Sequence, residues 1–410
     1  MTTAREVTTA HRWAMLALGV AAQSSSALFV HGIPFLIPAL RADGMSLAGA
    51  GFLVALPTVG IVLTLIAWGA LADRFGERVV LVTGLTLTAV AAAAATFTSS
   101  YVALGVCFLL GGMAAASSNS ASGRVVVGWF PAHRRGFAMG IRQMSQPLGV
   151  AIGAATIPAL AAAHGVNAAL SFPAVAAGVA AIGCLVGIVD PPRPSRSEAK
   201  RSGLLANPYR ESATLWRIHA VSVLLVIPQA TVWTFALVWL IERHHWSVAA
   251  AGILVTLTQL LGAAGRIGAG AWSDWLGSRM RPLRYVAMMA AATMALLAFT
   301  DWLDWRVAIA LLVVASVVTV ADNGLAFTAV AEIAGPYWSG RGLGIQNTGQ
   351  NLAAAAVPPV FGALITAAGY PVTFAVTAVI AAIAVPLVPR AVRTQSRQLQ
   401  SDDTAHDQRQ

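Results

Sequence analysis

The chain has 410 residues, of which 57% are hydrophobic and only 10% are charged, and its mean hydropathy is +0.72. This composition lies far outside the range of soluble domains and excludes a soluble multidomain enzyme. The formal net charge is +10, but the basic residues stand in short clusters between apolar runs, which is typical of membrane topology signals and not of nucleic-acid binding.

Apolar runs long enough to cross a bilayer recur along the whole chain. A spanning helix needs roughly 20 mostly apolar residues, and lipid cannot satisfy free backbone groups, so each run is expected to be a helix. We therefore predict an all-α membrane protein with twelve transmembrane helices. The runs are residues 13–37, 48–68, 78–97, 101–123, 137–162, 166–189, 217–241, 248–270, 284–300, 306–328, 341–366 and 370–388.

The basic residues predict the orientation. If successive loops alternate between two sides, one side receives only Arg41, Arg243 and Arg306. By the positive-inside rule the richer side is cytoplasmic, so we expect both termini there, in a multi-pass protein of the plasma membrane. The arginines assigned to the cytoplasmic side are Arg5, Arg12, Arg74, Arg78, Arg124, Arg134, Arg135, Arg279, Arg281, Arg284, Arg341 and those of the central linker and the tail.

One long polar break divides the chain. Residues 190–216 contain Pro191, Pro192 and Pro194, and they predict a cytoplasmic linker between a six-helix bundle of residues 1–189 and a second one of residues 217–390. Residues 391–410 are polar and are expected to form a disordered cytoplasmic tail.

An internal repeat supports this division. Residues 69–78 (GALADRFGER) are matched by residues 270–279 (GAWSDWLGSR), 201 positions later. Residues 136–141 (GFAMGI) are matched by residues 340–345 (GRGLGI), 204 positions later. Two matches at nearly one offset indicate a duplicated six-helix bundle whose halves face each other across an axis along the membrane normal, an arrangement that suits alternating access.

The segment of residues 69–81, GALADRFGERVVL, resembles the signature of the major facilitator superfamily in the loop between its second and third spans. Only Glu77 departs from that signature, because a basic residue is usual there. The number of spans, the repeat and the linker extend the resemblance over the whole chain. It implies a secondary transporter rather than an enzyme, and we expect it to act as a monomer.

The repeated loops predict a gate on the cytoplasmic side. Asp73 stands at a helix end, where its charge can accept hydrogen bonds from a neighbouring helix N-terminus or pair with Arg124 or Arg135. Asp274, with Arg279 or Arg284, is expected to be a weaker copy, because Trp275 replaces the expected arginine. The predicted gate residues are Gly69, Asp73, Arg74, Gly76, Arg78, Arg124, Asp274, Arg279 and Glu332.

Ionisable groups inside the spans are costly there and are candidates for function. Arg266 lies eight residues before Asp274, roughly two helical turns inside the membrane edge, and its permanent charge needs an anionic partner. Its place after Gly265 is similar to that of the arginine that meets the substrate's carboxylate in oxalate/formate and monocarboxylate porters. The alternative is that Arg266 reaches toward the cytoplasmic surface and pairs with Asp274.

Two departures from those porters bear on the substrate. Gly262 stands where the mammalian-type monocarboxylate carriers tend to have an aspartate. Gln346 and Asn347 replace the lysine that the oxalate porters use, which argues against a doubly charged substrate.

Arg142 in the fifth span is the second cation of the predicted cavity, with an interfacial position beside Arg134 and Arg135 as the alternative. A cavity lined by Arg142 and Arg266 would be electropositive and would favour a small organic anion. Amides in the spans can line the cavity or join helices. The predicted substrate-binding residues are Arg266, Arg142, Gln146, Asn119, Asn323, Gln346, Asn347 and Gln350.

Proton coupling needs a group whose charge changes at accessible pH. Asp322 in the tenth span and His31 in the first are the two candidates, since burial disfavours an ionised carboxylate and histidine titrates near neutrality. The alternative for each is structural: Asp322 as the partner of Arg266 or a hydrogen bond between helices, and His31 as an interfacial residue.

Other functions fit less well. A drug/proton antiporter would have a glycine-rich run ending in Gly-Pro in the fifth span, which this chain lacks. A membrane enzyme would need paired acidic metal ligands or a nucleophile with its base, and a sensor would be expected to have a longer cytoplasmic extension. We expect no cofactor and no metal; the expected partners are a small-molecule substrate, the lipid bilayer and protons, with no nucleic acid.

Overall fold

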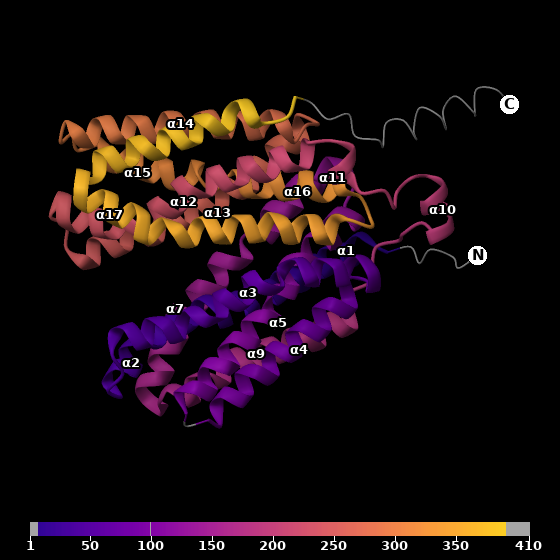
Figure 1. Cartoon of the computed structure of the whole chain (residues 1–410), viewed down its shortest axis with the longest axis horizontal. Coiled ribbons are helices and arrows are strands. Elements are labelled where there is room, and N and C mark those ends of the chain that lie inside the picture. Colours follow the sequence, from indigo (N-terminus) through magenta and orange to yellow (C-terminus); the bar gives the residue numbers. More distant parts are fainter. Residues whose placement is uncertain (1–6, 99, 391–410) are drawn as a thin grey trace.

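The computed structural model describes residues 7–98 and 100–390, and within these residues the chain forms helices and no strands. Arg5 and the predicted tail of residues 391–410 lie outside the described residues. The helices form two bundles that meet at one end of the molecule and diverge toward the other (Figure 1).

The first bundle contains the helices that precede the central linker. They are α1 (Thr9–Gly32), η1 (Ile33–Leu36), α2 (Ile37–Ala42), α3 (Leu47–Phe75), α4 (Glu77–Thr96), α5 (Tyr101–Trp129), η2 (Ala132–Arg134), α6 (Arg135–Arg142), α7 (Ser145–His164), α8 (Val166–Ala169) and α9 (Ser171–Gly187).

Two short helices, α10 (Arg196–Arg201) and α11 (Pro208–Glu211), belong to the segment between the bundles. The second bundle contains the helices that follow it. They are α12 (Thr214–His244), α13 (Val248–Trp275), α14 (Met280–Trp302), α15 (Val307–Val318), α16 (Asp322–Ala334) and α17 (Ser339–Leu387).

The described residues contain eleven segments long and apolar enough to span a membrane. One of them, α17, has 49 residues and is interrupted at Gly369, whose φ of 82° lies in the left-handed region that glycine adopts without strain. Figure 1 shows the parts of α17 before and after this bend running in opposite directions, from orange to yellow. The bend divides α17 into two spans, so the predicted number of twelve is confirmed.

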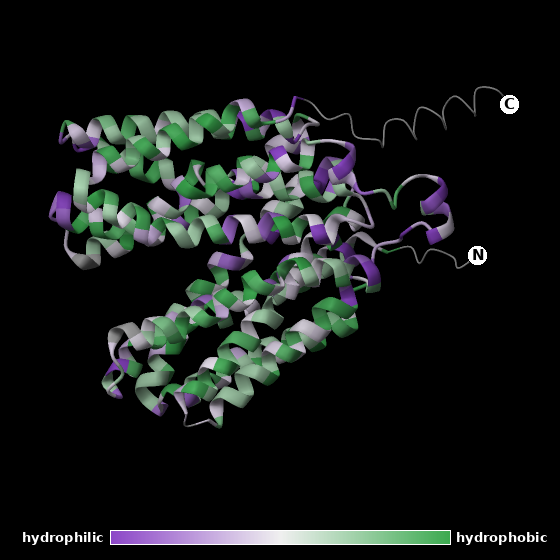
Figure 2. Cartoon of the chain, in the orientation of Figure 1, coloured by the Kyte–Doolittle hydropathy of each residue, from purple (hydrophilic) through white to green (hydrophobic). Residues whose placement is uncertain are grey.

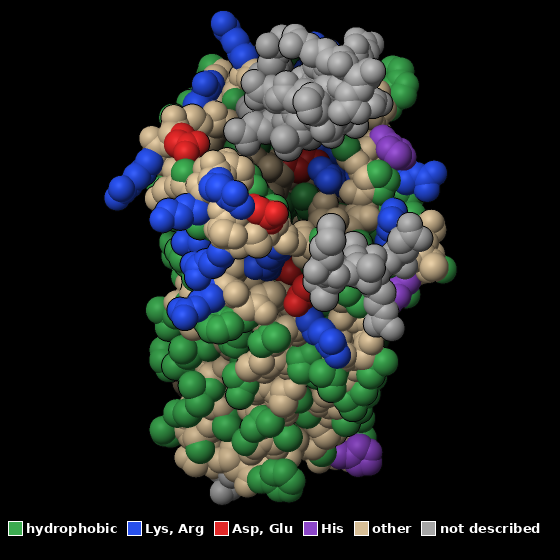
Figure 3. Space-filling view, turned by 90° about the vertical axis from the view of Figure 1, so that its right-hand side faces the viewer, with side chains coloured by type: hydrophobic (Ala, Val, Ile, Leu, Met, Phe, Trp, Pro, Cys, Tyr) green, Lys and Arg blue, Asp and Glu red, His purple; other side chains and the backbone are tan. Residues whose placement is uncertain are grey.

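Hydrophobic residues cover the outward-facing sides of both bundles, as expected for contact with lipid. Large side chains such as Val90, Ile182 and Leu260 are more than half exposed. Figure 2 shows hydrophobic residues along the helices and hydrophilic residues concentrated toward the end that carries the linker. Lysine and arginine side chains gather over this end in Figure 3, and we call it the basic end.

The two bundles touch at the basic end through pairs of glycines. A Cβ atom on Gly69 of α3 would lie 2.2 Å from the carbonyl oxygen of Gly340 on α17, and one on Gly270 of α13 would lie 2.1 Å from that of Gly136 on α6. Since real Cβ contacts are longer than 3 Å, only glycine permits this approach of two backbones. Both pairs come from the repeated motifs, one in each crossing.

The fifth and tenth spans are broken. Each was predicted as one run, over residues 137–162 and 306–328, with Pro147 expected to mark a bend in the fifth. The fifth span is interrupted between α6 and α7 at Gln143 and Met144, and the tenth between α15 and α16 at residues 319–321. Pro147 explains the first break, because it lacks the N–H group that would bond the carbonyl oxygen of Gln143, four residues earlier. Both breaks lie beside the cavity described below.

Candidate functional site

Asp73 caps a helix of the opposite bundle. Its carboxylate accepts hydrogen bonds from the backbone N–H groups of Gly340 (2.7 Å) and Arg341 (3.0 Å) in the first turn of α17, and from Nε of Arg341 (3.0 Å). The first N–H groups of a helix have no partner within that helix and carry the positive end of its dipole. The carboxylate therefore joins the first bundle to the second at the basic end.

Asp274 makes the equivalent contact in the opposite direction. It accepts hydrogen bonds from the N–H groups of Gly136 (2.9 Å) and Phe137 (2.8 Å) at the start of α6, and it pairs with Arg279 at 2.5 Å. These bonds of Asp274 to α6 do not involve position 275, where Trp275 replaces the expected arginine.

Glu332 at the end of α16 connects the two bundles a second time. It lies 3.2 Å from Arg279 of its own bundle and 3.5 Å from Arg135 of the other. Burial alone would lower the pKa of Arg279, but the carboxylates of Glu332 and Asp274 raise it above its ordinary value. Arg279 is thus held as a cation between two acidic side chains.

Several predicted gate residues lie elsewhere. Arg124 pairs with Glu77 at 2.5 Å and not with Asp73, because α17 already occupies the oxygens of Asp73. Arg74 lies over the ring of Phe75. The N–H of Arg78 donates to Asp190 (2.7 Å), and Gly76, with φ of 99°, forms the turn between α3 and α4.

The remaining predicted partners of the two aspartates are also engaged. Arg135 binds Glu332, as described above, and Arg284 donates to the carbonyl oxygen of Val388 at 2.9 Å. Neither of these arginines therefore serves the aspartate for which it was considered.

Side chains of both bundles line a cavity of about 110 Å³ between them. All predicted substrate-binding residues except Gln346 lie in its wall. The lining residues are Gln23, Asn119, Arg142, Gln143, Ser145, Gln146, Val226, Gln229, Ala230, Trp233, Arg266, Asn323, Phe327, Asn347, Gln350, Asn351 and Ala354.

Arg266 enters this wall from α13 and is only 4% exposed. Its Nη1 donates to the carbonyl oxygen of Gln143 (2.7 Å), the acceptor that Pro147 leaves free, and its guanidinium lies over the ring of Trp233. Its Nε is buried and has no hydrogen-bond partner among the described residues. Most of the donor capacity of Arg266 is therefore unused.

Arg142 lies at the end of α6 and is 2% exposed. Nε and Nη2 both donate to Oγ of Ser122 (3.0 and 2.9 Å), Nη2 also donates to the carbonyl oxygen of Asn119 (3.2 Å), and Nη1 donates to the side chain of Gln143. Phe327 of the opposite bundle lies beneath the guanidinium. Neutral acceptors thus satisfy most donors of Arg142.

Neither cation forms a direct ion pair, although the charge of Asp322 acts on Arg266 from a longer distance. Within the described residues, no carboxylate oxygen lies within 4.0 Å of a guanidinium nitrogen of Arg142 or Arg266. The alternative pairing of Arg266 with Asp274 is not observed, since Asp274 pairs with Arg279. The cavity therefore contains two positive charges from opposite bundles without direct compensation.

The amides repeat between the two halves. Gln23 donates to Asn119 at 2.8 Å, and Asn323 donates to Gln229 at 2.9 Å. Gln229 was not among the predicted residues, although it follows Gln23 by 206 positions, close to the offset of the repeat. The repeat was the sequence signal that could have found it.

Gln350 extends this network by donating to Asn323 at 2.9 Å. Gln346, one turn earlier on α17, does not line the cavity, because its side chain bonds His219 and Ser222 of α12 instead. Nothing in the sequence pattern indicated that His219 would hold it.

The two candidates for proton coupling lie behind the cavity wall. Asp322, at the start of α16, is 1% exposed, and neither of its carboxylate oxygens has a hydrogen-bond partner among the described residues. His31 on α1 lies 3.3 Å from Nε2 of Gln146, which does line the cavity.

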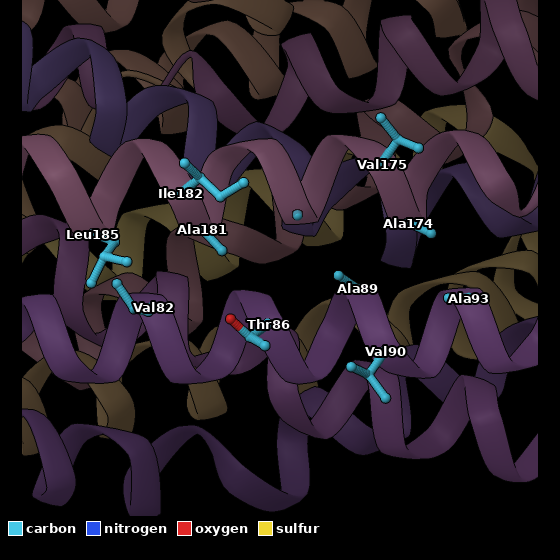
Figure 4. Close-up of a pocket in the computed structure, with 11 residues that line it drawn as sticks. Val82, Thr86, Ala89, Val90, Ala93, Ala174, Val175, Ala181, Ile182 and Leu185 are labelled. Carbon is cyan, nitrogen blue, oxygen red and sulfur yellow. The ribbon is translucent and has the colours of Figure 1, made fainter.

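A larger hollow of about 510 Å³ lies on the outside of the first bundle between α4 and α9 (Figure 4). Its lining is apolar except for Thr86, and exposed residues such as Val90 and Ile182 border it. It offers no charged group for a polar solute. In the part of the chain that the structure describes, no three His, Cys, Asp or Glu residues are placed to hold a metal ion.

Comparisons with known proteins agree with this architecture. Residues 16–358 match the family model described as Major Facilitator Superfamily. The chain is 55% identical over 379 residues to the uncharacterized MFS-type transporter Rv2994 of Mycobacterium tuberculosis, which covers 92% of this chain and 85% of that protein.

Solved structures share the fold at low sequence identity. The E. coli fucose:proton symporter FucP has a TM-score of 0.72 at 16% identity, covering 91% of this chain and 97% of that one. The human organic anion transporter MFSD10 has a TM-score of 0.70 at 18% identity, covering 93% of this chain and 100% of that one. The chain is thus a transporter and not an enzyme, and it belongs to the major facilitator superfamily.

Proposed function

We propose that this transporter moves a small organic anion, such as a monocarboxylate, across the plasma membrane by alternating access. The observation that carries the proposal is the pair of buried guanidinium groups, from Arg142 and Arg266, in one cavity without a carboxylate within 4.0 Å in the described residues. A buried charge without a direct ion pair is costly at this depth, and an anionic substrate relieves the cost.

Arg266 is the proposed binding group for the carboxylate. A guanidinium has five N–H donors, and the described residues accept only one hydrogen bond from that of Arg266. A carboxylate can accept two parallel hydrogen bonds from such a group. The cavity has a volume of about 110 Å³, which suits a small substrate.

The amides of the wall suit the remaining polar atoms of such a substrate. Asn119, Gln146, Asn323, Asn347 and Gln350 supply neutral donors and acceptors around the two cations. The positive wall argues against lipophilic cations, so the observations favour the anion over the alternative of drug/proton antiport.

Proton coupling is proposed for Asp322, with His31 as the alternative. An ionised carboxylate without hydrogen bonds is unfavourable in this buried position, and either a proton or the charge of Arg266 can offset that cost. A substrate that occupies Arg266 would then leave Asp322 to take up a proton. This order of events supports symport of the anion with a proton.

The gate at the basic end is the proposed barrier on the cytoplasmic side, with both termini also cytoplasmic. The bundles of residues 1–189 and 217–390 would rock as two bodies around the central cavity. Asp73 and Asp274 support this proposal, because each binds the N-terminus of a helix in the other bundle and holds the basic end closed.

Thermal stabilisation of the purified protein by small carboxylates tests the anion site. Arg266→Gln should abolish the stabilisation, since the loss of a charged hydrogen-bond donor weakens binding by roughly ten- to a hundredfold. Arg142→Gln is the comparison: it should lower the melting temperature of the empty protein but retain part of the ligand shift. Stabilisation of the parent by lipophilic cations and by no carboxylate would contradict the proposal.

A further inference from the structure

The central linker crosses the closed end of the molecule and binds both bundles. On the first bundle, Arg193 donates to the carbonyl oxygens of Ala72 (2.9 Å) and Asp73 (2.6 Å), and it pairs with Glu77 at 2.6 Å. These carbonyl groups belong to the last turn of α3, and that of Ala72 also accepts the N–H of Gly76 (3.1 Å). Arg193 therefore binds the same helix end that bears the capping carboxylate of Asp73.

On the second bundle, the linker binds the residues that precede α17. The hydroxyl of Tyr337 donates to the carbonyl oxygen of Pro194, and Nε1 of Trp338 donates to that of Leu205 (3.3 Å). These two aromatic residues in turn hold Arg341. Its guanidinium lies 3.7 Å from the ring centroid of Trp338, and its Nη2 donates to the carbonyl oxygen of Tyr337 (2.8 Å).

These contacts connect the linker to both sides of the bond between Asp73 and Arg341. Arg341 binds the carboxylate of Asp73, while Arg193 binds the backbone carbonyl of the same aspartate. The linker thus contacts the immediate neighbours of both partners in one interbundle bond. Opening the basic end would pull Arg193 and Pro194, which are adjacent in the chain, toward different bundles.

Glu77 explains why the linker supplies this cation. The position usually carries a basic residue in the signature that the loop resembles, and here the acidic side chain is fully buried. A buried carboxylate needs paired positive charge, and Arg124 of the bundle and Arg193 of the linker both reach its Oε1 atom. The acidic residue at position 77 therefore binds Arg193 and holds the linker beside the gate.

We propose that Arg193 is a positioning residue of the gate and that the linker stabilises the form closed at the basic end. This goes beyond the proposed function and rests on the gate described there, but it requires no knowledge of the substrate. Its loss should shift the empty transporter toward the form that is open at the basic end.

Labelling of a cysteine in the gate measures this shift. Ser339, the first residue of α17, is 1% exposed, so Ser339→Cys in a chain with Cys107→Ala and Cys184→Ala should react with a maleimide only when the basic end opens. Arg193→Gln should raise the labelling rate roughly tenfold, since it removes several charged hydrogen bonds. Arg193→Lys should give an intermediate rate, because one ammonium group cannot reproduce the fork of a guanidinium.

Arg196→Gln is the matched control, since it removes an exposed arginine from α10 of the same linker and should leave the rate unchanged. Unfolding is reported by native Cys184, which is fully buried in the first bundle and should stay unlabelled in a companion chain that keeps it. A labelling rate at position 339 that does not respond to Arg193→Gln, or that rises equally in Arg196→Gln, would overturn the proposal.

If Arg193→Gln also makes Cys184 reactive, the variant has unfolded, and the milder variant Tyr337→Phe then tests the proposal. It removes only the hydroxyl that binds the carbonyl oxygen of Pro194, and it leaves Glu77 paired. The proposal predicts faster labelling at position 339 in this variant too, and an unchanged rate would overturn it. Because no substrate is added, a failure of the anion proposal would leave both results intact.

Discussion

The two arginines of the cavity, Arg142 and Arg266, differ in how many of their N–H donors already have a partner. Arg142 gives its hydrogen bonds to Ser122, Asn119 and Gln143, whereas Arg266 gives one, to a backbone carbonyl. The same residue type therefore supports the wall in one bundle and remains open to a ligand in the other. Gln143 joins the two, because its side chain meets Arg142 and its backbone meets Arg266.

Asp322 gives a prediction at the same scale. Asp322→Asn is close in shape but cannot take up a proton, so transport by the variant should lose the dependence on pH that the parent shows. Initial rates between about pH 5 and pH 8 in proteoliposomes measure this. His31→Gln serves as the comparison, and a pH profile that vanishes there but persists in Asp322→Asn would assign the coupling to histidine instead.

Sequence reasoning found single polar residues in the apolar spans well. Arg266, Arg142 and the pair Asn119 and Asn323 stood out because each is costly in lipid, and the structure places all four in one wall. It could not separate Gln350 from Gln346, which share a helix face. They differ because Gln346 binds His219 of α12, and the spacing of residues within α17 does not predict a contact with another helix.

The broken fifth span is the feature of the cavity that matters most at the scale of elements. Pro147 removes the helical partner of the Gln143 carbonyl, and Arg266 of the other bundle takes its place. Pro147 was expected to bend the fifth span, but the sequence did not identify Arg266 as the donor to the carbonyl oxygen of Gln143. The tenth span breaks at residues 319–321 without proline or glycine there, so no residue at that point predicts the break.

Pro147→Ala tests this relation. The new N–H group can bond the Gln143 carbonyl within the helix and compete with Arg266, which frees a donor for the substrate. Carboxylate affinity should rise by roughly two- to tenfold, the value of one hydrogen bond. Isothermal titration measures it, with Pro158→Ala in the exposed part of α7 as the control. Weaker or unchanged binding would show that Arg266 is not limited by this carbonyl.

The crossing of α6 and α13 gives the second prediction about elements. Gly270→Ala would place a Cβ atom 2.1 Å from the carbonyl oxygen of Gly136, far inside ordinary contact, so the helices must separate. The form closed at the basic end should lose stability, and Ser339→Cys should be labelled faster. Gly268→Ala is the matched control, since nothing lies within 4 Å of its added carbon. Equal labelling of the two variants would contradict the role assigned to the crossing.

At the scale of the whole molecule, the repeat that the sequence shows accounts for the arrangement of the gate. The contacts of Asp73 with α17 and of Asp274 with α6 are two copies of one device, and Gln23 with Asn119 and Gln229 with Asn323 are two copies of another. The two halves differ in the cavity itself, because Arg266 comes from the second half and supplies the guanidinium that has unused donors. A duplicated bundle thus supplies equivalent contacts at the basic end and a cavity whose two sides differ.

Flux of radiolabelled short carboxylates into proteoliposomes tests the central claim most directly. The account predicts saturable uptake of at least one monocarboxylate by the parent, and loss of that uptake in Arg266→Gln with the protein still folded. Uptake of carboxylates by Arg266→Gln at the rate of the parent, or a parent that carries none of them, would contradict it.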